Sequence, residues 1–117
     1  MFDMNSSNFE NSFEDFIKEI PNGKLLGIWV YSQEFYSLPE FGYKIHISLD
    51  SNNYKEVLGI CLPYLIENKI SFKMIASYLD LLSLNRGDYG YTQMGKDITV
   101  YPENIVALKK SYSNCIL

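Results

Sequence analysis

The sequence of 117 residues has little of what marks several large classes of protein. Its only two cysteines, Cys61 and Cys115, form no CxxC pair and have no histidine near them in the sequence, which argues against a zinc motif or a disulfide framework. We expect two buried thiols in a reducing compartment, and therefore a cytoplasmic protein. The N-terminus lacks a basic start followed by an apolar run, so neither secretion nor a membrane partner is expected.

An excess of basic residues is also missing. The chain has 10 lysines and arginines against 14 acidic residues, a net charge of −4, and its basic residues are scattered along the sequence. This distribution argues against a nucleic-acid partner, so any anionic partner must be bound by a local cluster. What the chain does have is the length of one domain and a hydrophobic content of 47%, enough for a single core.

The first half of the chain contains a predicted helix and two predicted strands. Apolar residues at helical spacing from Phe13 to Ile20 predict a short amphipathic helix that ends at Pro21. The apolar run Leu25–Phe35 is predicted to be one buried strand. Over Tyr43–Leu49 the alternation is strict and puts Tyr43 with the apolar residues on one face, and Lys44 and the only histidine, His46, on the other.

The second half alternates helices and strands. Asp50 or Ser51 can cap a helix that runs to about Asn68, in which Pro63 predicts a kink or an early end. We then expect a strand over 70–75, a short helix over 78–84, a loop of glycine and tyrosine over 87–95, a strand over 96–101 and a helical tail from residue 103. The predicted fold class is α+β, with a small mixed or antiparallel sheet and flanking helices.

Five basic side chains stand on or beside the predicted strands and the glycine-rich loop. Lysine and arginine give charge-assisted hydrogen bonds to phosphate oxygens, so such a set suits an anion. From the residues alone, a solvated surface remains the more common explanation of such a pattern. The five are Lys44, His46, Lys73, Arg86 and Lys96.

Three segments carry a resemblance to a known family: Tyr43–Ser48, Ile70–Lys73 and Gly95–Pro102. In this order they resemble the lyase domain of class III lanthipeptide synthetases and the related class IV enzymes, over roughly residues 25 to 105. More distantly they are similar to bacterial phosphothreonine lyase effectors. The resemblance implies a phosphothreonine-lyase-like fold and β-elimination of phosphate from phosphoserine or phosphothreonine, which leaves dehydroalanine or dehydrobutyrine. It implies no metal and no organic cofactor.

The resemblance also implies roles for individual residues. Lys73 resembles the general base that removes the α-proton, and His46 resembles the general acid that protonates the departing phosphate. The implied phosphate-binding residues are Lys44, Arg86 and Lys96, and the candidates for the peptide site are Tyr89 and Tyr91.

One departure from the family pattern lies next to these residues. Asp97 follows Lys96 where family members more usually have an aromatic residue. If the strand alternates there, Asp97 points away from Lys96; if it does not, the carboxylate would weaken phosphate binding.

The resemblance implies a phosphorylated precursor peptide as partner, and a place beside the kinase and cyclase domains of the same synthetase. Under this interpretation residues 1–20 form a polar segment and a short helix, and residues 21–117 form the lyase domain, excised from a longer enzyme. A module that binds a phosphopeptide or a leader peptide without turning it over is the alternative. An interaction domain in which Lys73 and His46 are only surface residues is the third possibility.

Overall fold

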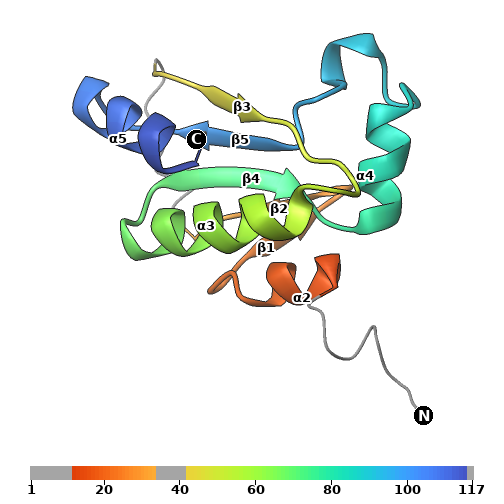
Figure 1. Ribbon diagram of the computed structural model, residues 1–117, viewed down its shortest axis with the longest axis horizontal. Helices are drawn as coiled ribbons and strands as arrows, with labels where there is room; N and C mark the ends of the chain where they lie inside the picture. The colour runs from red at the N-terminus through yellow and green to blue at the C-terminus, as the bar shows by residue number, and fades with distance from the viewer. Residues whose placement is uncertain (1–11, 34–41, 116–117) are drawn as a thin grey trace.

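The computed structural model describes residues 12–33 and 42–115. It has an α+β fold, as predicted, in which an antiparallel five-stranded sheet has the strand order β1-β2-β4-β5-β3 (Figure 1). The strands are β1 (Lys24–Leu26), β2 (Trp29–Tyr31), β3 (Ile45–Ile47), β4 (Ser71–Ile75) and β5 (Ile98–Tyr101). The helices are α2 (Phe13–Lys18), α3 (Tyr54–Glu67), α4 (Tyr78–Asn85), the 3₁₀ turn η2 (Tyr91–Gln93) and α5 (Ile105–Cys115).

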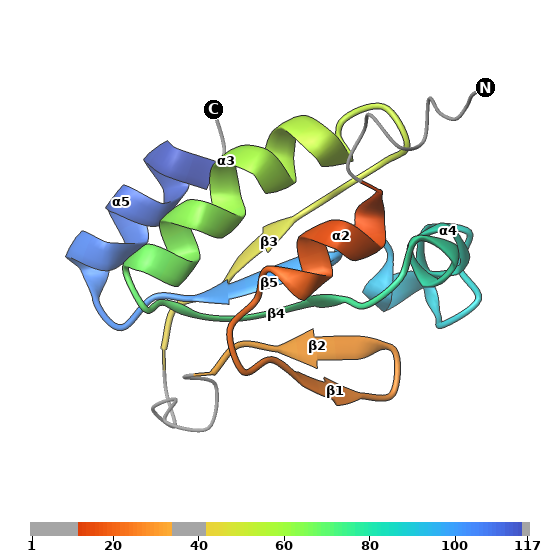
Figure 2. The same cartoon turned by 90° about the horizontal axis from the view of Figure 1, so that it is seen from below.

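The helices are distributed unevenly around the sheet. Figure 2 shows α2, α3 and α5 on one face and α4 at one end. None of these helices lies over the opposite face, which we call the open face. Within the described ranges, no helix is long and apolar enough to cross a membrane.

Strand register brings four side chains into one row on the open face. Tyr31 of β2 pairs with Lys73 of β4, Lys73 pairs with Thr99 of β5, and Thr99 pairs with His46 of β3. Since side chains alternate along each strand, paired residues share a face of the sheet. The neighbours of this row on each strand point to the helices and are buried.

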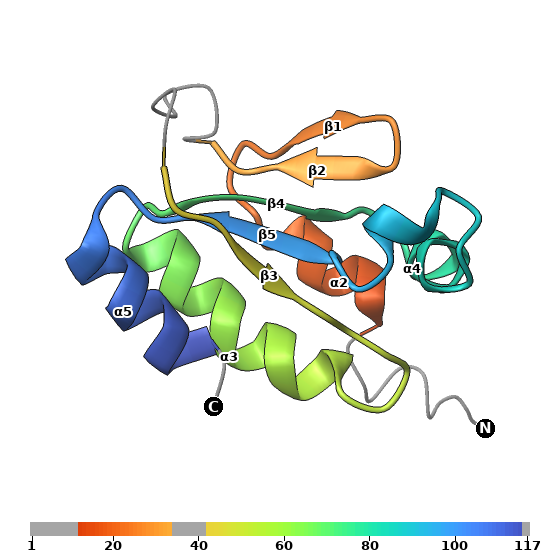
Figure 3. The same cartoon turned by 90° about the horizontal axis from the view of Figure 1, so that it is seen from above.

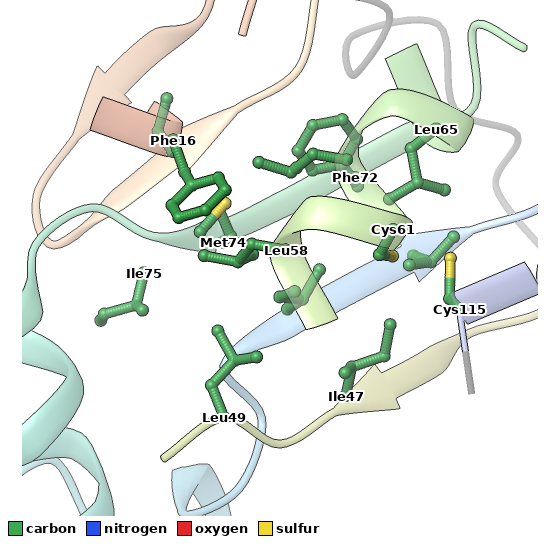
Figure 4. Packing of buried hydrophobic residues seen from close by; sticks show 14 of the residues in the cluster. Phe16, Ile47, Leu49, Leu58, Cys61, Leu65, Phe72, Met74, Ile75 and Cys115 are labelled. Atoms are coloured by element: carbon green, nitrogen blue, oxygen red, sulfur yellow. The ribbon is translucent and has the colours of Figure 1, made fainter. Parts of the chain in front are cut away.

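The core fills the space between the sheet and its helices (Figure 4). Leu58, Leu62 and Leu65 of α3 are fully buried. Cys61 and Cys115 are buried free thiols, as predicted, and they share a hydrogen bond between α3 and α5 that contributes to a raised pKa of Cys61 and a lowered pKa of Cys115. The core also includes buried residues from the first 20 positions: Phe13, Phe16 and Ile20.

The prediction of one buried strand over Leu25–Phe35 is wrong within the described residues. The segment is a hairpin of β1 and β2, since Leu26 pairs with Trp29 across a loop of two residues. Gly27 begins this loop with a φ of +63°, a conformation that glycine adopts without strain and that tight hairpins require there. The side chains of β1 are exposed, and the part of the predicted strand from residue 34 to 35 lies outside the described residues.

Helix α3 does not end early at Pro63; it continues to Glu67. The proline removes one backbone hydrogen bond, but apolar residues on both sides of it are buried against the sheet, and this burial stabilises the helix. The helix begins at Tyr54, a turn later than predicted, because the Asp50 carboxylate accepts hydrogen bonds from the backbone N–H groups of Asn52 and Asn53 in a preceding turn.

The strands predicted on either side of the basic cluster are shorter than expected. β3 covers Ile45–Ile47 of the predicted 43–49, and β5 begins at Ile98 and not at Lys96. Tyr43 is exposed, so it does not join the buried set. The strand over 70–75, the helix over 78–84 and the helical tail are confirmed to within two residues.

Candidate active site

A small polar pocket lies on the open face of the sheet and has a volume of about 180 Å³. Four of the five predicted basic residues meet there: Lys44, His46, Lys73 and Lys96. His46 lies on β3, Lys44 immediately before β3, Lys73 on β4, and Lys96 in the turn before β5. Segments far apart in the sequence therefore contribute to one site. The other residues that line the pocket are Trp29, Gln93, Thr99 and Tyr101.

Lys73 stands at the middle of β4, on the opposite face from the buried Phe72 and Met74, as predicted. Its Nζ atom lies 4.6 Å from the centroid of the Trp29 ring. Burial and the charges of Lys44 and Lys96 lower the pKa of Lys73. The lowered pKa increases the share of the neutral amine, the form in which a lysine can accept a proton.

His46 lies two strands away from Lys73 in the row across the sheet. Its Nδ1 atom is 3.1 Å from the hydroxyl oxygen of Thr99, a side chain that is only 2% exposed. Burial and the charges of Lys96, Lys44 and Lys73 lower the pKa of His46. In the empty pocket the imidazole is therefore biased toward its neutral form, and an anion among the lysines would oppose that bias.

The two remaining lysines are placed in different ways. Lys44 precedes β3, and its Nζ atom lies 5.8 Å from the centroid of the Tyr101 ring. Lys96 follows Gly95, whose N–H donates to the Asn85 side chain and whose C=O accepts from the Ser48 hydroxyl, both at 2.8 Å. The φ of Gly95 is +80°, and a Cβ atom there would come within 3.0 Å of that hydroxyl, so the position requires glycine.

Asp97 points away from the pocket, as strand alternation predicted for it. Its carboxylate is fully buried and accepts hydrogen bonds from the Leu49 N–H at 2.7 Å and from the Asn85 side chain at 3.0 Å. Burial raises the pKa of Asp97, although these hydrogen bonds oppose that effect. The residue ties β5 to the ends of β3 and α4, and it does not line the pocket with Lys96.

The structure does not bring Arg86 into the cluster. Arg86 is the C-cap residue of α4, where the chain turns tightly, so its guanidinium reaches the carboxylate of Asp88 and forms a hydrogen-bonded ion pair with it. This pairing raises the pKa of Arg86 and lowers that of Asp88. The side chain is largely exposed and does not line the pocket.

The two tyrosines proposed for the peptide site also lie outside the pocket lining. The Tyr89 hydroxyl donates to the Asp80 carboxylate at 3.3 Å, and partial burial together with the nearby acidic groups raises the pKa of Tyr89. Tyr91 is 89% exposed in the turn η2. Their role in peptide binding stays a prediction.

Four residues that line the pocket were not singled out from the sequence. Thr99 and Tyr101 could have been found, because they alternate with the buried Ile98 and Val100 on the strand that follows Lys96. Trp29 was hidden inside the run that we predicted as one buried strand. Gln93 lies in the irregular loop, where no periodic pattern indicates which side chains point inward.

Metal-binding groups are not gathered in the part of the chain that the structure describes. No group of three or more histidine, cysteine, aspartate or glutamate side chains there could hold a metal ion. The chemistry of the pocket is that of amines, an imidazole and a hydroxyl.

Comparison with models of known protein families gives a match. The family model "RamC, N-terminal domain" matches residues 22–114, which include every basic residue of the pocket. No curated protein matches the chain. The matched region covers well over half of the sequence, and it includes the three segments that resemble lanthipeptide synthetases. The chain therefore belongs to the RamC N-terminal domain family, which is related to the lanthipeptide synthetases.

Proposed function

We propose that this protein eliminates phosphate from phosphoserine or phosphothreonine in a lanthipeptide precursor peptide, leaving dehydroalanine or dehydrobutyrine. The observation that carries the proposal is the meeting of Lys44, His46, Lys73 and Lys96 around one small polar pocket. A pocket with this charge suits a phosphate group, and within it burial and neighbouring cations lower the pKa of Lys73.

In the proposed reaction Lys73 is the general base. Its neutral Nζ takes the α-proton, and the electron pair of the Cα–H bond becomes the second bond between Cα and Cβ. The Cβ–O bond breaks, and its electron pair leaves on the phosphate oxygen. Lys44 and Lys96 bind the phosphate and neutralise the charge that develops on it.

His46 is the proposed general acid. The phosphate dianion would bring negative charge next to the imidazole and so raise the pKa that the three lysines lower in the empty pocket. Binding of substrate would thus load His46 with the proton that it then gives to the departing phosphate oxygen. The Thr99 hydroxyl, 3.1 Å from Nδ1, can accept a hydrogen bond from the charged ring and orient it.

The family context supports the proposed partners. The matching family model is that of the N-terminal domain of RamC. The sequence also resembles the lyase portion of synthetases that continue into further domains. We propose that a kinase domain of the same synthetase phosphorylates the precursor peptide, and that a cyclase domain uses the dehydrated product. Neither metal nor organic cofactor is part of the proposed step.

The test is the intact mass of a short peptide with one phosphoserine after incubation with the protein. Elimination removes the elements of phosphoric acid and leaves a dehydroalanine, which a thiol then adds to. Hydrolysis would return the serine hydroxyl, with a mass one water larger than that of the dehydrated peptide. Formation of the hydrolysed peptide, with its serine hydroxyl restored, would contradict the proposal. An unchanged mass of the phosphopeptide with the kinase and cyclase domains present would also contradict it.

Binding without turnover is the second candidate, and one observation favours it. The lowered pKa of His46 biases the imidazole of the empty pocket toward its neutral form, which is suited to hydrogen bonding more than to acid catalysis. A binding module would show phosphopeptide affinity that falls when Lys44 or Lys96 is neutralised, with the mass of the peptide unchanged.

A further inference from the structure

The hairpin of β1 and β2 borders the open face beside the pocket. Figure 3 shows this hairpin on the opposite side of β4 from α3 and α5. Trp29 of β2 lines the pocket, and it pairs with Leu26 of β1 next to the loop of the hairpin. The surface of the open face therefore continues from the pocket onto the hairpin.

Strand register places the side chains of Trp29 and Leu26 on the open face. Trp29 pairs with Ile75, which lies two residues beyond Lys73 on β4. Residues two apart on a strand share a face of the sheet, and so do residues paired across strands. Trp29 and Leu26 therefore stand on the same face as Lys73, and Leu25 is directed to the opposite face.

These two side chains form an apolar surface next to the proposed base. The Trp29 ring is partly buried, and its centroid lies 4.6 Å from the Nζ atom of Lys73. Leu26 is 68% exposed. A single exposed leucine is common on protein surfaces, but this one extends the aromatic wall of a polar pocket, an arrangement typical of ligand sites. We call Trp29 and Leu26 together the apolar platform.

The proposed reaction determines where the substrate lies relative to the platform. The phosphate is bound among Lys44, His46 and Lys96, and the α-proton must reach Lys73. In phosphoserine the phosphorus is joined to Cα only through one oxygen and Cβ, so Cα lies within about one strand spacing of the phosphate. The reacting Cα is therefore above β4, over Lys73, with the phosphate on the side of β5 and β3 and the hairpin on the other side.

We infer that the apolar platform binds the side chain of one residue adjacent to the phosphorylated residue, and that the preferred substrate carries an aliphatic residue at that position. The inference rests on the proposed function and names a specificity site for its peptide. Successive Cα atoms of a peptide are about 3.8 Å apart. Since the Trp29 ring lies against the Lys73 amine, a side chain on the next residue reaches the ring and then Leu26.

The platform lies on one side of Lys73 only. Trp29 is paired with Ile75, whereas Tyr101 is paired with Ser71, two residues from Lys73 in the other direction along β4. On that other side the pocket is lined by Tyr101 and Lys44, which carry a hydroxyl and an amine. A preference for an aliphatic residue is therefore expected at one of the two flanking positions and not at both.

The size and kind of the effect follow from the chemistry of the contact. Burial of part of one aliphatic side chain favours leucine over asparagine by about tenfold in kcat/KM. The platform contacts a part of the peptide that does not react, so it stabilises the bound substrate and the transition state alike. The tenfold difference should therefore lie in KM, with kcat unchanged.

The experiment uses the full chain and phosphoserine peptides of equal length, with leucine or asparagine either before or after the phosphoserine. Mass spectrometry gives kcat and KM for wild type, Leu26→Asn and Leu25→Asn. Leu25 is the matched control, since it is 70% exposed on the same strand and lies on the opposite face. We expect Leu26→Asn to reduce the preference for leucine to less than about threefold, and Leu25→Asn to retain it. A preference that survives Leu26→Asn would contradict the inference.

The failures are distinguishable. Elimination with the same KM for every peptide would overturn the inference and leave the proposed function intact. An equal gain from leucine at both flanking positions, or a gain in kcat alone, would also overturn the inference only. Neither binding nor elimination of any phosphopeptide would remove both. If Leu26→Asn converted a dimer to a monomer without changing the preference for leucine, the platform would be a contact between copies of the chain, which again overturns the inference.

Discussion

Lys73 and His46 stand in one row across the sheet, with Thr99 between them. Two strand spacings separate their backbones, about 10 Å, and both side chains rise from the open face toward the same pocket. Regular strands hold both groups, so their spacing is set by backbone hydrogen bonds. A proposed base and a proposed acid need this rigidity in order to act on the α-proton and on the departing phosphate oxygen of the same residue.

Replacement of Lys73 by alanine tests the proposed base. We expect Lys73→Ala to lower the rate of elimination by about 10²–10⁴, because general base catalysis contributes that much, and to leave the Kd for a phosphopeptide within a few-fold of wild type. Mass spectrometry gives the rate, and calorimetry gives the affinity. Lys18→Ala is the control, since Lys18 is largely exposed on α2. Full activity of Lys73→Ala would remove Lys73 from the mechanism.

The dependence of kcat/KM on pH tests how the neighbouring cations act on Lys73. The rate should rise with pH as Lys73 loses its proton, because the neutral amine is the base. After burial, the charge of Lys44 is the main cause of the lowered pKa of Lys73, so Lys44→Met raises that pKa. The rising part of the profile should therefore move to higher pH. A profile that stays in place, with only KM increased, would show that Lys44 binds phosphate without tuning the base.

His46 can be followed alone by NMR, because the chain contains one histidine. Burial and the three lysines predict a pKa below the ordinary value of about 6.5 in the free protein. Inorganic phosphate should raise this pKa by placing negative charge among the lysines. Lys96→Met should raise it in the absence of phosphate, and Lys18→Met should leave it unchanged. A pKa that does not respond to phosphate would argue against phosphate binding beside His46.

Stability measurements test whether helix α2 belongs to the folded unit. The family match begins at residue 22, yet Phe13 is buried in the core and its ring lies near those of Tyr54 and Tyr78. Phe13→Ala should lower the free energy of unfolding by about 3–5 kcal/mol in urea denaturation, the usual cost of deleting a buried phenylalanine.

Leu25→Ala is the control for this measurement, since Leu25 is 70% exposed on β1. It should change the free energy of unfolding by less than about 0.5 kcal/mol. Equal small effects of both variants would mean that α2 adds little to the stability of the fold.

The sequence predicted the elements whose periodicity is strong. The alternation around His46 and around Lys73 placed both side chains on the polar face of their strands, and the structure confirms these placements. The hairpin of β1 and β2 was missed because the run from Leu25 to Tyr31 shows no alternation of apolar and polar residues, although β1 is exposed; only Gly27 marked the turn. Periodicity reports which face a residue lies on and carries no information about which strands become neighbours.

Only part of the candidate site was predicted, because periodicity does not indicate which strands become neighbours. The basic residues on or next to strands met at the pocket because the strand order β4-β5-β3 brings their segments together. Arg86 was chosen by its charge and its position beside a glycine-rich loop, but a nearby carboxylate satisfies it locally. Local pairing of this kind depends on the exact path of a turn, which residue type alone does not determine.

The arrangement around Gly95 has a consequence for how such sites are compared between proteins. Lys96 reaches the pocket from a turn that is held by Asn85, Ser48 and the buried Asp97, none of which lines the pocket. A homologue could keep every lysine and still lose the arrangement if it lost these supporting side chains and the glycine. Searches for working members of the family should therefore weigh the asparagine and the glycine as heavily as the cations.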